Sequence, residues 1–323
     1  MERDPARPPL ALIVAGPTAS GKSALALDLA ERLAGTVINA DAMQVYRELH
    51  VLTARPSPEE EARVPHALYG VRAAVEPGSV AWWRTAALTE MARARGAGRL
   101  PILTGGSGLY FASLTEGLAE IPDPGPAARI EARGLLKEIG PAALHARLAE
   151  VDPATVLGVR PTDSKLIARA WEVLQATGTG LAAWQSRAAQ PAPWRFAAIL
   201  LDPPREALRR AIAARLVGML HAGALDEVRT LLALDLDPAL PAMRAHGVPE
   251  LAAHLRGELP LEQAVRRIEL VTGQYTKRQA TWFRHHKLAD AAGTHTIRAR
   301  MEGIEQYSEQ NQPALLTFIE SLG

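Results

Sequence analysis

The residues with the clearest chemical meaning are those at positions 16–23, which read GPTASGKS. They fit the pattern G-x-x-x-x-G-K-[ST], whose glycines let the backbone curl and point successive N–H groups at phosphate oxygens. A following helix adds its positive dipole end, the lysine adds a full charge, and the serine hydroxyl can hold Mg²⁺. We therefore predict a diphosphate-binding loop made of Gly16, Pro17, Thr18, Ala19, Ser20, Gly21, Lys22 and Ser23, with Ser23 as metal ligand.

The elements around this loop must hold it between a strand and a helix. Apolar runs typical of buried strands occupy residues 10–16, 36–40, 100–106 and 194–202. Helical periodicity occupies residues 22–33 and 80–98, and later 204–222, 224–234, 247–256 and 261–287. Alternating strands and helices are the signature of an α/β fold with a parallel sheet and helices on both faces.

The pattern also divides the chain into parts. After Gly117 the strand candidates stop, and residues 127–178 have helical character only. We therefore expect an α/β core that carries the phosphate loop, an all-helical insertion, and a C-terminal tail without readable chemistry. Their boundaries are 8–118 and 195–288 for the core, 119–194 for the insertion and 289–323 for the tail.

Composition excludes several classes of site. The chain contains no cysteine, so disulfides, thiolate zinc sites and cysteine nucleophiles are absent. The formal net charge is only +1, although residues 195–287 hold 14 Lys and Arg against 10 Asp and Glu. That mild excess fits either a polyanion-binding face or an ordinary solvated surface. The N-terminal residues lack a secretory segment and no apolar run reaches membrane-spanning length, so we expect a cytoplasmic protein without membrane contact. The sequence offers no sign of an obligate interface, so we also expect a monomer.

The sequence lacks one feature that nucleotide hydrolases and kinases usually have. Nucleotide hydrolases and kinases usually carry a strand that ends in an acidic residue and holds Mg²⁺. The best strand for that purpose, residues 100–106, ends in Thr104 and glycines. The loop is therefore expected to bind a pyrophosphate group rather than to support ordinary nucleotide chemistry.

Three further segments complete a recognisable set: DAMQVY at 41–46, PILTGGSGLY at 101–110 and YTKRQATWFR at 275–284. In this order with GPTASGKS they closely resemble the tRNA dimethylallyltransferases, over roughly residues 10–286. The resemblance implies transfer of a dimethylallyl group from dimethylallyl diphosphate to N6 of the adenosine 3′ of the anticodon in tRNA. It also implies release of diphosphate and assistance by Mg²⁺.

The resemblance assigns roles to individual residues. Asp41 matches the general base that accepts the N6 proton, although alone it could be a turn residue or helix cap. Ser107 stands where the family usually has threonine and would hydrogen-bond the bridging oxygen of the leaving diphosphate. Arg215 would also contact this diphosphate. Gln44 would read the adenine edge, with Ala42 and Met43 beside it.

The remaining candidates would contact tRNA. Arg129, Lys165 and Arg169 lie in the segment that resembles the family's anticodon-stem grip. On the last long helix, Lys277, Arg278 and Arg284 are candidates, and Arg266, Lys277 and Arg284 share one side at about 100° per residue. The helical wheel puts Ile268, Val271, Tyr275 and Trp282 on the opposite, apolar side, and the basic side could also be a solvated face.

The chain departs from the family pattern mainly at RNA-side positions. Gly273 stands in place of an arginine, and Val248–Pro249 replace an aromatic residue and a cation. Three alternatives therefore stay open: a small-metabolite kinase, an RNA-binding protein without activity, and a prenyltransferase acting on free adenylate. Asp41 argues against the kinase, and the helical insertion argues against a small acceptor.

Overall fold

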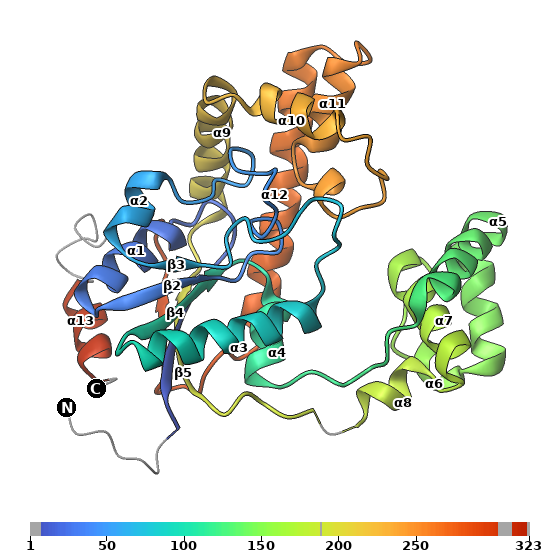
Figure 1. Cartoon of the computed structure of the whole chain (residues 1–323), viewed down its shortest axis with the longest axis horizontal. Coiled ribbons are helices and arrows are strands. Elements are labelled where there is room, and N and C mark those ends of the chain that lie inside the picture. Colours follow the sequence, from blue (N-terminus) through green and yellow to red (C-terminus); the bar gives the residue numbers. More distant parts are fainter. Residues whose placement is uncertain (1–7, 188, 303–311, 322–323) are drawn as a thin grey trace. The chain divides into compact units, whose positions relative to one another are not determined.

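The computed structural model describes residues 8–187, 189–302 and 312–321. Six described strands form one sheet in the order β3-β2-β4-β1-β5-β6, and every neighbouring pair is parallel (Figure 1). The strands are β1 (Leu10–Ala15), β2 (Gly35–Asn39), β3 (His66–Ala67), β4 (Leu100–Gly105), β5 (Arg195–Leu201) and β6 (Thr294–Ile297).

Helices cover both faces of the sheet because both faces of its strands are apolar. Along β1, Leu12 and Val14 pack into one cluster with α1 (Lys22–Arg32) and α13 (Gln312–Ser321). Ile13 and its neighbours pack on the other side with α3 (Val80–Gly96) and α4 (Gly108–Thr115). The α/β core with a parallel sheet covered on both faces is therefore confirmed.

A third apolar cluster joins the segment after β2 to the later helices. Val45, Leu49 and Leu52 pack there against Leu216, Val228 and Ile268. The helices and the short 3₁₀ turn of this region are α9 (Arg205–His221), α10 (Ala224–Leu232), η1 (Ala242–Arg244), α11 (Val248–Leu255) and α12 (Leu261–His285). This cluster anchors the segment that carries Asp41 to the helices that carry Arg215 and Gln279.

Residues Glu116–Pro191 form a second compact unit with its own core. It consists of α5 (Gly125–Val151), α6 (Pro153–Val156), α7 (Ser164–Thr177) and α8 (Leu181–Gln185). Gly140 has a positive φ of 78° and precedes Pro141, so α5 is kinked there. Residue 188 of the expected insertion lies outside the described residues.

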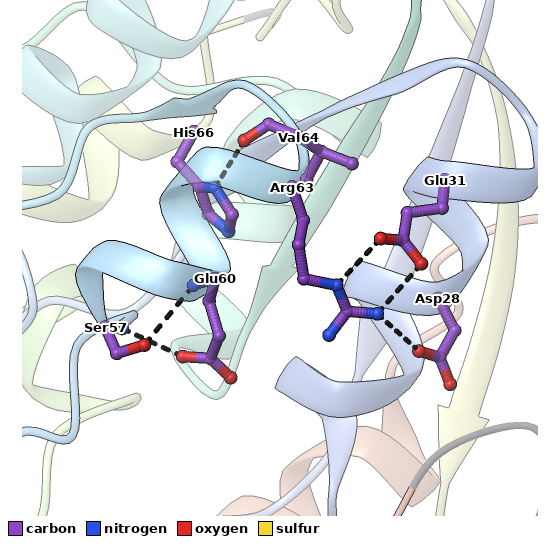
Figure 2. Close-up of polar contacts among 7 residues, drawn as sticks. All are labelled: Asp28, Glu31, Ser57, Glu60, Arg63, Val64 and His66. Carbon is purple, nitrogen blue, oxygen red and sulfur yellow. Dashed lines mark hydrogen bonds and ion pairs between the residues drawn. The ribbon is translucent and has the colours of Figure 1, made fainter.

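A short helix that the periodicity did not reveal, α2 (Pro58–Arg63), packs beside α1 (Figure 2). The Ser57 hydroxyl accepts the Glu60 N–H, and the Glu60 carboxylate accepts the Ser57 N–H, which together form a capping box. Arg63 then bonds Glu31 through two nitrogens, at 2.7 and 2.8 Å, and reaches Asp28 at 3.5 Å. These contacts fix α2 to the C-terminal half of α1, the helix that follows the phosphate loop.

The C-terminal residues, set apart above as a tail, join the core. Thr294–Ile297 extend the sheet as β6, and Met301, Leu315 and Phe318 lie in the cluster that covers β1. Residues 303–311 and 322–323 of the expected tail lie outside the described residues, as do residues 1–7, on which the expectation about a secretory segment rested. Within the described ranges, no helix is both long and apolar enough to cross a membrane.

Replacement of Leu315 tests whether the C-terminal helix stabilises the core. Leu315 is fully buried, so Leu315→Ala should lower the free energy of unfolding by about 2–5 kcal/mol, the usual effect of removing a buried leucine side chain. Leu270 is 62% exposed, and Leu270→Ala is the matched control with an expected change below about 0.5 kcal/mol. Urea unfolding measures both, and equal midpoints would show that α13 adds nothing to stability.

Candidate active site

The phosphate loop adopts the curled backbone that its sequence requires. It follows β1 directly, and α1 begins at Lys22. Ala19 and Gly21 both have positive φ angles, 67° and 92°, so two left-handed residues turn the chain into the helix. The Lys22 ammonium bonds the Pro17 carbonyl oxygen at 3.4 Å, across the mouth of the loop. This conformation suits successive N–H groups converging on an anion.

Gln279 of α12 bridges the phosphate loop and the loop after β4. Its Oε1 accepts the Thr18 N–H at 2.9 Å, and its Nε2 donates to the Gly106 carbonyl oxygen at 2.9 Å. The residue is 95% buried, so both amide bonds form away from solvent. Gln279 lies in the predicted tRNA-side motif but was not among the predicted site residues. The available signal in the sequence was a single amide within an otherwise basic motif, whereas its burial is visible only in the structure.

Asp41 and Ser107 are brought together at the carboxyl edge of the sheet. Asp41 follows β2, and one carboxylate oxygen accepts the Met43 N–H at 2.9 Å in a turn. Ser107 follows β4, and its hydroxyl accepts the Ala42 N–H at 3.0 Å. The backbone supports this contact, since the Ser107 N–H donates to the Ala40 carbonyl oxygen at 3.2 Å. The turn role of Asp41 therefore exists, and Ser107 holds the backbone of the next residue, Ala42.

A cavity of about 360 Å³ opens beside the phosphate loop. Lys22, Ser23 and Arg215 line it, and the Arg215 guanidinium donates to the Thr53 carbonyl oxygen at 3.1 Å. Burial lowers the pKa of Lys22 to about 8; the nearby Asp41 carboxylate opposes this shift, and Arg215 adds to it. Burial also lowers the pKa of Arg215, again against the pull of Asp41. Lys22 and Arg215 therefore line the cavity, and the charge of the Asp41 carboxylate acts on both.

Three phenols feel the charge of the Asp41 carboxylate. Burial, with a smaller contribution from the negative charge of Asp41, raises the pKa of Tyr275 to about 12. The same two causes, in the same order, raise the pKa of Tyr69 and of Tyr110. Tyr110 stacks on Trp83 with ring centroids 4.3 Å apart. These phenols stay protonated at neutral pH, so none of the three serves as a proton acceptor there.

Gln44 is placed differently from the expectation that it reads a base through both amide atoms. Its Nε2 donates to the carbonyl oxygens of Thr53 and Ala54, each at 3.0 Å. The Thr53 carbonyl also accepts from Arg215, so Gln44 helps to hold the segment that positions this guanidinium. The amide oxygen is the atom of Gln44 left to contact a bound base.

Comparison with known proteins identifies the architecture. The sequence model of the IPP transferase family matches residues 44–286, which is most of the chain. The chain belongs to the IPP transferase family. Its curated relatives include proteins named tRNA dimethylallyltransferase from Granulibacter bethesdensis and from Gluconobacter oxydans, each 60% identical. These alignments cover 96% of this chain and 98% and 93% of the two relatives.

Solved structures agree with this membership. The tRNA isopentenylpyrophosphate transferase of Bacillus halodurans superposes with a TM-score of 0.67 at 28% identity, covering 98% of this chain and 96% of that one. A eukaryotic dimethylallyltransferase acting on tRNA superposes with a TM-score of 0.78, covering 97% of this chain and 80% of that one. At 22% identity, the second likeness concerns the fold alone.

The basic side of α12, which carries the IPP transferase family motif, is exposed, but part of it is paired with carboxylates. Lys277 and Arg278 are exposed, and the Arg278 guanidinium lies 5.5 Å from the Tyr275 ring centroid. Arg284 instead forms a two-pronged ion pair with Asp202, at 2.7 and 3.0 Å, and Arg266 pairs with Glu262. The buried side also differs from the helical-wheel expectation, because it is formed by Ala264, Ile268, Thr272, Thr276, Gln279 and Phe283.

The candidates in the insertion lie on two helices that pack together. Arg129 of α5 forms an ion pair with Asp123, and Arg169 of α7 pairs with Glu172 at 3.4 Å. Lys165 is exposed near the start of α7. An RNA phosphate would therefore have to compete with a carboxylate at two of these three positions.

The lowered pKa of Lys22 predicts a pH limit for anion binding. A diphosphate favours the charged ammonium, so affinity should be complete below about pH 8 and fall as Lys22 loses its proton above that value. Pyrophosphate has its own titration, which cancels in the ratio of wild-type affinity to that of Lys22→Met. Calorimetry should show this ratio falling by up to about tenfold per pH unit above pH 8. A ratio that stays constant to pH 10 would contradict the assignment.

Proposed function

We propose that the chain transfers a dimethylallyl group from dimethylallyl diphosphate to N6 of the adenosine 3′ of the anticodon in tRNA. The observation that carries the proposal is that Lys22 and Arg215 line one cavity beside the phosphate loop, while the charge of the Asp41 carboxylate acts on the pKa values of both. A leaving diphosphate needs cations, and an attacking amine needs a base, so one site serves both ends of the reaction. Membership of the IPP transferase family and relatives named tRNA dimethylallyltransferase support the substrates.

The residues divide the work between the leaving group and the acceptor. As the allylic C–O bond breaks, negative charge grows on the diphosphate, where Lys22, Arg215 and the loop amides stabilise it. As N6 bonds to the allylic carbon, its proton passes to Asp41. The Ser107 hydroxyl, fixed by the Ala42 N–H, would donate to the bridging oxygen. Free diphosphate then remains on the loop until it leaves.

Magnesium fits this cavity through hydroxyl groups and the substrate. Ser23 lines the cavity, and so does Thr104, whose buried Oγ1 has no hydrogen-bond partner among the described residues. Across the described ranges, no three His, Cys, Asp or Glu side chains are grouped as a cation site. Ser23 would therefore hold Mg²⁺ together with phosphate oxygens, and the ion would neutralise charge on the leaving group.

Basic side chains in each unit, considered separately, are the proposed tRNA contacts. We assign phosphate contacts to the exposed Lys277 and Arg278 on α12 and to Arg129, Lys165 and Arg169 in the insertion. Arg284 would contribute only by exchanging Asp202 for a phosphate. Contacts of this kind carry affinity rather than sequence information. The exocyclic amine would reach Asp41, flanked by Ala42, Met43 and the amide oxygen of Gln44.

Asp41→Asn tests the chemical step. The amide cannot accept the N6 proton, so turnover should fall by about 10² to 10⁴, the usual contribution of a general base, while pyrophosphate binding stays intact. The assay is transfer of labelled dimethylallyl to unmodified tRNA with Mg²⁺, with AMP as alternative acceptor and ATP as alternative phosphate donor. Asp235→Asn, an exposed acid in a left-handed turn, is the matched control. An unchanged rate in Asp41→Asn would remove this residue from the mechanism.

Lys277→Ala tests the RNA face. Loss of one phosphate contact should weaken tRNA binding and reduce the slope of log affinity against log salt by about one. Arg95→Ala removes the same charge from the exposed end of α3 and should leave the slope unaltered. Filter binding of tRNA over a salt series measures both variants. Equal slopes for the two variants would show that the exposed side of α12 does not meet RNA.

A further inference from the structure

The segment after β6 brings a charge to the phosphate cavity that the motifs do not account for. Arg300 lines this cavity together with Lys22, Ser23 and Arg215. Its Nε donates a hydrogen bond of 3.2 Å to the carbonyl oxygen of Ala19, a residue 281 positions earlier in the sequence. A side chain from the end of the described core therefore contacts the phosphate loop itself.

The backbone next to Arg300 also lies against the loop. The Met301 N–H donates to the Ser20 carbonyl oxygen at 2.9 Å. The Met301 carbonyl oxygen occupies the space that a Cβ on Gly21 would need, so the two backbones touch. Met301 is 98% buried in the cluster that contains Leu315 and Phe318. We call residues 297–301 the C-terminal strap.

The strap holds the carbonyl side of the loop, which is the side opposite the anion. If the loop N–H groups converge on a phosphate, the carbonyl groups of the same peptides point outward and need other partners. Arg300 and Met301 supply partners to the carbonyls of Ala19 and Ser20. Ala19 has a left-handed φ of 67°, which a non-glycine residue keeps only when its surroundings hold it. The strap is therefore placed to keep the loop in its binding shape.

Arg300 has more donors than the Ala19 carbonyl uses. One terminal nitrogen forms an ion pair with Glu302, and the side chain remains 34% exposed. Arginine carries five N–H donors in a fixed fork, so one face can hold the loop while the charge reaches the cavity. Glu302 competes with any anion for this guanidinium, and its removal should free the charge.

We propose that Arg300 is a positioning residue of the diphosphate site, which fixes the Ala19 peptide through Nε and adds a third cation beside Lys22 and Arg215. The ligand class is a diphosphate, either as an allylic ester or as free pyrophosphate. This inference rests on the proposed function, since it concerns the site that would hold the leaving group. The proposal assigns a chemical role to the C-terminal strap, which contains none of the sequence motifs.

The test is calorimetric titration of the full chain with inorganic pyrophosphate and Mg²⁺. Arg300→Ala should weaken binding by about tenfold, the effect of losing one charge-assisted contact, and Arg300→Lys should fall between it and the wild type. Arg298→Ala is the matched control, because Arg298 is exposed, belongs to the same strap and does not line the cavity. Its binding should equal that of the wild type.

A variant that should tighten pyrophosphate binding distinguishes the effect of the Arg300 charge from a loss of folding. Glu302→Ala removes the competing carboxylate and should tighten pyrophosphate binding by about two- to threefold. In transfer assays, Arg300→Ala should raise the KM for dimethylallyl diphosphate and leave the KM for tRNA unchanged. Thermal unfolding checks that each variant is folded. If Arg300→Ala does not fold, the comparison of Arg300→Lys and Glu302→Ala with the wild type is the test.

The outcomes distinguish this inference from the proposed function. Equal pyrophosphate affinities for Arg300→Ala and Arg298→Ala would overturn the role of Arg300 and leave the transferase intact. Weaker binding in Glu302→Ala would overturn the charge contribution, because the strap would then act only as packing. A wild-type chain that binds no pyrophosphate would overturn the diphosphate site, and with it both the inference and the proposed function.

Discussion

The phosphate loop depends on one constraint: its peptide planes must be held in the binding shape by atoms outside the loop. A loop that binds through backbone N–H groups gains most when those groups are fixed before the anion arrives. Here Gln279 holds the Thr18 peptide from α12, and α1 fixes the loop's end at Lys22. The strap contacts the peptides of Ala19 and Ser20. Two distant segments and the adjoining helix α1 thus hold these eight residues.

The sheet order explains why the remaining groups meet at the same place. β1 lies between β4 and β5, and β2 lies beyond β4. Since all the strands are parallel, the segments that follow β1, β2 and β4 leave the sheet at one edge. These segments carry the phosphate loop, Asp41 and Ser107. The contact between Ser107 and the Ala42 N–H then links the base to the leaving-group side.

The sequence could predict the features that local pattern decides. The phosphate loop, the long strands and α12 follow from glycine spacing, apolar runs and periodicity. The capping box of α2 was also readable in the residues from Ser57 to Glu60, although periodicity alone missed so short a helix. β6 has only four residues, and the ion pair between Asp202 and Arg284 joins positions 82 apart, so neither leaves a local signal. The role of Gln279 likewise depends on tertiary contacts.

The family arginine that Gly273 replaces would have contributed charge rather than packing. A Cβ at position 273 would meet no atom within 4 Å, so packing does not require Gly273 in α12. A glycine inside a helix also costs roughly 1 kcal/mol relative to alanine. The missing arginine therefore removes a charge without a structural gain, while Asp202 and Glu262 occupy Arg284 and Arg266. The basic character of α12 toward a polyanion thus depends mainly on Arg267, Lys277 and Arg278, which are exposed and form no ion pair within the described residues.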